Sequence, residues 1–115
     1  MSPSDSLRAF IAPVLPNWRI QFGRWIDGAK TDRYAVIRPM GGLPVSTVRR
    51  PEFSLMLIGA STDAATVPDT FAQAVIAAMQ ADDVNPIYMQ PGEPVYWATD
   101  DGRPVAEIAI SFITD

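Results

Sequence analysis

The residue types that most often carry out chemistry in proteins are largely missing from this sequence. It has no histidine and no cysteine, and Lys30 is its only lysine. Cys/His zinc sites, thiol nucleophiles and the Ser-His-Asp triad are therefore excluded. For the same reason, no hydroxyl group has a credible base to activate it as a nucleophile. The sequence predicts no enzyme activity, no catalytic residue, no metal site and no cofactor.

Two pairs of adjacent aspartates are the remaining candidates for acid–base or metal chemistry. They are Asp82-Asp83 and Asp100-Asp101. Adjacent carboxylates in a turn point apart, and the spacing of these pairs matches no calcium-binding loop. We therefore interpret both pairs as solvated turns.

Aromatic and arginine side chains near the N-terminus suggest a different chemistry, the stacking of nucleic-acid bases. The sequence has three tryptophans, which are Trp18, Trp25 and Trp97. Trp18 alternates with Ile20 and Phe22 along a predicted strand, so we expect it in the core. Trp25 falls outside this alternation and is expected to be exposed. A single-stranded nucleic-acid-binding module stays open as an alternative, although a net charge of −4 makes nucleic acid an unfavoured partner.

A glycine-rich segment and an arginine pair are candidates for contacts with another protein. Met40-Gly41-Gly42-Leu43 lacks the Lys-Ser/Thr of a phosphate-binding loop, so it predicts a flexible loop or a bulged strand end. A loop of this kind can also order against a partner, which is a second hypothesis. Arg49-Arg50 precedes a strongly predicted strand and is suited to an ion pair between subunits. The candidate interaction residues are Arg38, Met40, Gly41, Gly42, Arg49, Arg50 and Trp25.

Charge is unevenly distributed along the chain. Residues 1–50 contain eight basic and three acidic residues, whereas residues 51–115 contain one basic and ten acidic residues. If these halves form opposite patches, a basic patch on one copy meets an acidic patch on the next. Such head-to-tail contacts close into rings; scattered surface charge is the simpler alternative.

The helices and strands that would position these residues are predicted from hydrophobic periodicity and from the eleven prolines and seven glycines, which interrupt regular structure. We expect a short helix starting at Ser4 or Asp5, a strand over 18–22 and a strand over 33–38 that ends at Pro39. A central strand over 52–59 and a helix over 68–81 follow. A terminal hairpin joins strands at 95–99 and 105–114 through the turn 100–103.

This order favours an α+β fold over a doubly wound parallel sheet, because helices and strands do not alternate. The prediction is a single domain over residues 1–115, with a mixed or mostly antiparallel sheet of four or five strands and two helices packed on one face. The N-terminus lacks the features of a signal peptide, and no stretch reaches the roughly 20 apolar residues that span a bilayer. We therefore expect no membrane association.

Two blocks of the sequence, residues 34–42 (YAVIRPMGG) and 49–59 (RRPEFSLMLIG), resemble the middle of small phage and prophage tail terminator proteins, also called tail completion or minor tail proteins. The short first helix, the second helix and the closing hairpin are similar in order to that family. The compact loops depart from it, because they leave little material for an arm that reaches the tail tube.

The resemblance implies a structural protein of the virion tail, assembled in the bacterial cytoplasm. It implies a ring homo-oligomer, typically a hexamer, that caps the tail tube, stops its polymerisation and joins the tail to the head–tail connector. The expected partners are further copies of the chain, the tail tube protein and the connector, with no cofactor. The segment 40–48 and Arg49-Arg50 would contribute ring or tube contacts. A head–tail joining or minor capsid protein remains an alternative.

Overall fold

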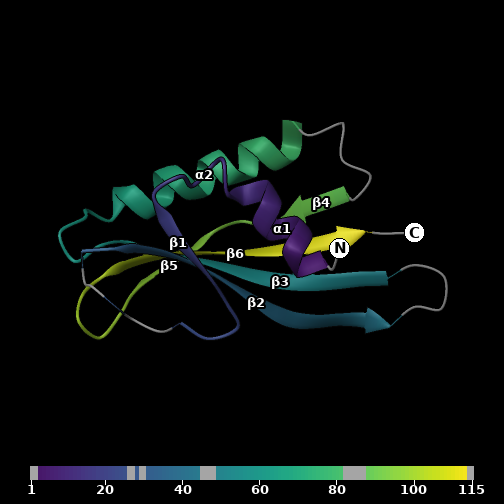
Figure 1. Cartoon of the computed structure of the whole chain (residues 1–115), viewed down its shortest axis with the longest axis horizontal. Helices are drawn as coiled ribbons and strands as arrows, with labels where there is room; N and C mark the ends of the chain where they lie inside the picture. The colour runs from purple at the N-terminus through teal and green to yellow at the C-terminus, as the bar shows by residue number, and fades with distance from the viewer. Residues whose placement is uncertain (1–2, 26–27, 29–30, 45–48, 82–87, 114–115) are drawn as a thin grey trace.

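The computed structural model describes residues 3–25, 28, 31–44, 49–81 and 88–113. These residues form two helices and a six-stranded sheet (Figure 1). In chain order the elements are α1 (Pro3–Ile11), β1 (Trp18–Phe22), β2 (Arg33–Pro44), β3 (Arg49–Ile58), α2 (Thr66–Ala81), β4 (Tyr88–Pro91), β5 (Val95–Ala98) and β6 (Pro104–Ile113). The fold is α+β, as predicted.

The sheet is mixed, with the strand order β1-β2-β3-β6-β4 and with β5 also paired to β6. β1 runs parallel to β2, and the other pairs are antiparallel. β4 and β5 share the outer edge of β6, because β4 pairs with residues 110–113 and β5 with residues 104–107. β3 is central, as its apolar sequence predicts.

Both helices cover one face of the sheet, which we call the helix face (Figure 1). Leu7 and Ile11 of α1 are fully buried there, as are Ala72 and Val75 of α2. The sheet contributes alternate residues of its strands, including Ala106, Ile108, Ile110 and Phe112 of β6. The alternation predicted for this last strand is therefore confirmed, and the two apolar helix stripes pack where the sequence places them.

The opposite face of the sheet, which we call the open face, has no helix over it in the described part of the chain. It carries a smaller apolar cluster of Tyr34, Val36, Met56, Ile58 and Val105, against which Trp25 packs. These residues alternate with the helix-face residues on the same strands, because successive side chains of a strand point to opposite faces. The central strands therefore bury apolar side chains on both sides.

Two sequence predictions about the sheet need correction. The sheet has six strands rather than four or five, because β4 was not predicted: it is short, ends at Pro91 and shows no alternation. β2 does not end at Pro39 but continues to Pro44, with a register shift between Pro39 and Gly41. Proline cannot donate a ladder hydrogen bond, so a bulge next to it lets the strand continue.

Candidate interaction surfaces

β2 and β3 continue together beyond the rest of the sheet. β1 pairs only with residues 33–37 of β2, and β6 pairs only with residues 52–58 of β3. The pairs Gly42↔Pro51, Leu43↔Arg50 and Pro44↔Arg49 therefore have no strand beside them in the described part of the chain. We call residues 41–44 and 49–51 the β2–β3 extension.

The extension brings together most of the predicted interaction residues. Gly41 and Gly42 lie on one strand, and Arg49 and Arg50 lie on the other, within a few ladder positions. Met40 precedes them and is 55% exposed. The interpretation of this segment as a bulged strand end is confirmed; residues 45–48 lie outside the described residues. Two segments that the sequence separates are thus paired side by side in the sheet.

Arg38 and Trp25 lie apart from the extension. Arg38 pairs with Ser54 and is half-buried on the open face. Trp25 is also half-buried, so the prediction that it is exposed was wrong. Its ring lies 6.1 Å from that of Tyr34 and 5.3 Å from the guanidinium of Arg103. The nucleic-acid alternative required an exposed Trp25 as a stacking platform, and this feature is absent.

A second surface was not predicted: β5 exposes three consecutive large side chains. The exposed fractions are 62% for Val95, 52% for Tyr96 and 43% for Trp97. A hollow of about 300 Å³ lies beside them, lined by Asp69, Tyr96, Trp97, Pro104 and Val105 among others. The Tyr96 hydroxyl donates to Asp69 at 2.5 Å, and the Trp97 indole donates to Glu107 at 3.3 Å. The sequence predicted this strand but not that it would remain uncovered.

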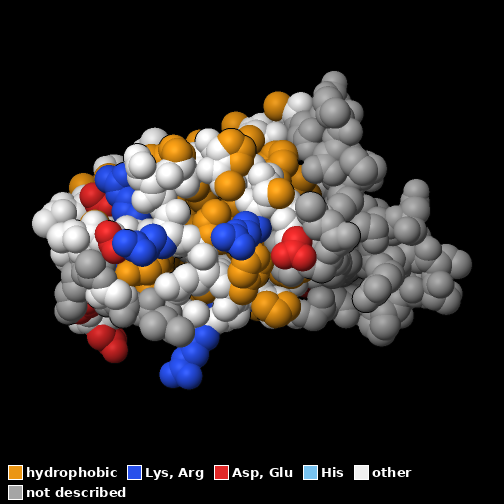
Figure 2. Space-filling model, viewed as in Figure 1, with side chains coloured by type: hydrophobic (Ala, Val, Ile, Leu, Met, Phe, Trp, Pro, Cys, Tyr) orange, Lys and Arg blue, Asp and Glu red, His pale blue; other side chains and the backbone are white. Residues whose placement is uncertain are grey.

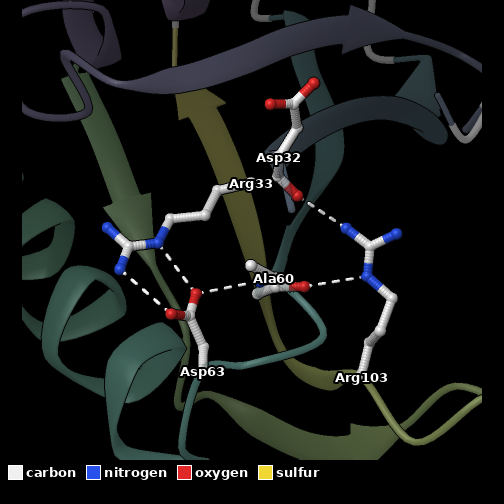
Figure 3. Close-up of polar contacts among 6 residues, drawn as sticks. Asp32, Arg33, Ala60, Asp63 and Arg103 are labelled. Atoms are coloured by element: carbon white, nitrogen blue, oxygen red, sulfur yellow. Dashed lines mark hydrogen bonds and ion pairs between the residues drawn. The ribbon is translucent and has the colours of Figure 1, made fainter. Parts of the chain in front are cut away.

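A bidentate ion pair anchors the loop between β3 and α2 to the start of β2 (Figure 3). Arg33 donates from Nε to Asp63 Oδ2 at 2.8 Å and from Nη2 to Oδ1 at 3.1 Å. The Ala60 N–H also donates to Asp63 Oδ2, at 2.8 Å. Hydrogen bonding by Arg33, opposed in part by burial, lowers the pKa of the Asp63 carboxyl below its ordinary value, and the same bond raises the pKa of Arg33.

Arg103 is fully buried beside this ion pair and connects three segments (Figure 3). Its Nε donates to the Gly59 carbonyl at 2.9 Å, and its Nη2 donates to the Asp32 carbonyl at 2.7 Å. The guanidinium also lies over the rings of Trp25 and Tyr34. The β5–β6 hairpin is thereby held to the ends of β2 and β3. The sequence does not indicate this role, because a charged residue that follows a turn is ordinarily expected to be solvated.

The structure describes one of the two aspartate pairs, Asp100-Asp101, and that pair gives no indication of metal chemistry. Asp100 and Asp101 lie exposed in the turn between β5 and β6, as predicted, and Thr99 Oγ1 bonds Asp101. Gly102 in that turn has a φ of 84°, a conformation that favours glycine. Asp82-Asp83 lies outside the described residues. Among the residues described, no group of three or more acidic side chains could hold a metal ion.

Comparison with known proteins identifies the family of the chain. The family model of the phage tail termination protein matches residues 1–115. The chain belongs to this tail termination family. The resemblance inferred from residues 34–42 and 49–59 is therefore confirmed. No curated protein matches the chain.

As a tail termination protein, the chain is a structural component of tail assembly and of the virion tail. The described helices include none with the length and apolarity that crossing a bilayer requires.

Proposed function

We propose that the chain forms a ring, a hexamer, on the last layer of the tail tube. There it stops tube polymerisation and provides the surface that joins the tail to the head–tail connector. Assembly takes place in the bacterial cytoplasm, and no catalytic step is involved. The observation that carries this proposal is the family match over residues 1–115.

The β2–β3 extension is the surface we assign to contact with the tube or with neighbouring copies. Its outer backbone groups have no neighbouring strand among the described residues, and such edges readily pair with another chain. Arg49 and Arg50 place two positive charges on this segment. Arginine binds carboxylates in a bidentate manner, which suits contact with an acidic partner.

The function is tested by removing the gene from the phage and examining the particles by electron microscopy. A tail terminator is required to stop tube growth, so its loss is expected to give tails of uncontrolled length without heads. A head–tail joining protein, the alternative function, would instead leave tails of normal length that lack heads. Tails of normal length would therefore overturn the proposal in favour of that alternative.

Supplying the double variant R49E/R50E in place of the natural protein is expected to reproduce much of the defect. Reversing both charges replaces attraction by repulsion at the contact, and like-charge juxtaposition costs several kcal/mol. The number of infectious particles is expected to fall by at least about tenfold. The matched control, R49K/R50K, keeps both charges and is expected to retain most function. Normal particle numbers with R49E/R50E would exclude the extension as a contact surface.

A further inference from the structure

We propose that neighbouring copies in the ring join through the two lateral edges of the sheet, with β5 of one protomer lying antiparallel to β1 of the next. This inference rests on the ring in the proposed function and names the surfaces that would close it. The occupant of each edge is thus a second copy of this chain.

The β1 edge is basic and partly apolar. No strand lies on the outer side of β1 in the part of the chain that the structure describes. Phe22 is 41% exposed at its end, and the Arg8 guanidinium lies 5.7 Å from the centre of this ring. Arg19 and Arg24 are exposed, and Arg19 pairs with Asp32. Figure 2, which views the molecule from this edge, shows basic side chains with apolar patches between them and acidic groups beside some.

The β5 edge is acidic and more apolar. All four residues of β5 are exposed and none of them is charged, whereas edge strands that stay free are often protected by charged side chains or proline. Acidic side chains surround it. Asp69 accepts from Tyr96, Glu93 precedes the strand, and Asp100 and Asp101 line a hollow with Trp97. The sequence from residue 51 to residue 102 contains no basic residue.

Opposite charges on opposite edges favour a head-to-tail contact. If two β5 edges met, their carboxylates would repel each other, and two β1 edges would oppose their arginines. A β1 edge against a β5 edge instead brings arginines to carboxylates. Repeating such a heterologous contact generates a ring when the rotation closes.

Strand directions and side-chain faces fit this junction. β1 runs parallel to β2, whereas β5 runs opposite to it, because the three successive pairings β2–β3, β3–β6 and β6–β5 are all antiparallel. A β1 strand beside β5 of a similarly oriented copy is therefore antiparallel to it.

The aromatic side chains at the two edges also lie on the same face of the sheet. Phe22 pairs with Ile37 and Tyr96 pairs with Ala106, so both rings lie on the helix face. The hollow beside Tyr96 offers an apolar space for the Phe22 ring of the next copy.

Because the natural chain has no cysteine, the junction can be tested by site-directed cross-linking. The variant Q21C/V95C places one thiol on each edge, both on the open face. It would be treated with a short bismaleimide in cells that are assembling tails, so that the tube is present. We expect a ladder from dimer up to the closed ring. Each single variant is expected to give no product, and a mixture of the two is expected to give dimers only.

Two controls make the result decisive. The variant A74C/A77C, with both thiols on the exposed side of α2, measures random collision. In the Q21C/V95C protein, R19E/R24E or D100K/D101K is expected to reduce the ladder at least about tenfold, and mixing these two proteins is expected to restore it. A ladder no stronger than the α2 control, or homodimers from a single variant, would overturn the junction. If tail length nevertheless still depends on the protein, the proposed function stands and only the assigned edges are wrong.

Discussion

Replacing Arg103 with methionine is expected to lower the free energy of unfolding by about 2–4 kcal/mol. The methionine side chain retains the bulk of the arginine but donates no hydrogen bond. The carbonyl oxygens of Gly59 and Asp32 would each lose a charge-assisted donor in a buried position. The aromatic rings of Trp25 and Tyr34 would also lose the cation that lies over them.

Urea unfolding followed by tryptophan fluorescence measures this loss, and Trp25 is a local reporter because its ring contacts Arg103. The variant R103K serves as a matched control. Lysine keeps the charge but lacks the planar fork that reaches both carbonyls, so an intermediate loss is expected. If R103M were as stable as the natural protein, the bonds made by Arg103 would contribute nothing to holding the hairpin.

Replacing Asp63 with alanine is expected to cost about 2–3 kcal/mol of unfolding free energy. The substitution removes both acceptors of Arg33 and the acceptor of the Ala60 N–H together. It leaves the arginine charge partly buried without its carboxylate. Thermal or urea unfolding at neutral pH gives the value. D63N keeps the shape and one acceptor oxygen, so we expect a smaller loss; equal stability of all three proteins would contradict the assigned role.

The same ion pair predicts how stability depends on pH. Because the pKa of Asp63 is lower in the folded chain than in the unfolded chain, ionised Asp63 contributes stability above its unfolded pKa. This contribution is lost as the pH falls through the lower, folded pKa. The difference in unfolding free energy between the natural protein and D63N is therefore expected to shrink below about pH 4. A difference that stayed constant down to pH 2.5 would contradict this expectation.

Most of the fold could be predicted because hydrophobic periodicity and the turn-forming prolines and glycines act locally. The apolar stripes of both helices, the alternation of β6 and the turn at residues 100–103 were sufficient to place these elements. β4 could not be predicted, since four residues ending in proline have no period of their own. The strand β4 forms because it pairs with the edge of β6. The continuation of β2 through Gly41 and Gly42 likewise depends on β3 as a partner.

The surfaces were less accessible to prediction than the fold. Met40–Gly42 and Arg49-Arg50 were selected separately, and only the ladder register shows that they form one segment. Trp25 was expected in solvent because it breaks the alternation of β1, but Tyr34 and Arg103 provide a contact on the open face. Val95 and Trp97 of β5 are exposed because they lie on the open face, which no described helix covers. Burial of this kind is decided by tertiary packing, which a single sequence does not display.

The position of β6 constrains when the molecule can fold. This strand comprises residues 104–113 yet lies between β3 on one side and β4 and β5 on the other (Figure 1). Until these residues have left the ribosome, β3 has an open edge, and the buried side chains of both helices lack much of their packing surface. Folding must therefore largely follow synthesis of residue 113 rather than accompany translation. Chains that stop before Pro104 would present an unpaired, strongly apolar β3, which is a substrate for chaperones and proteases rather than for ring assembly.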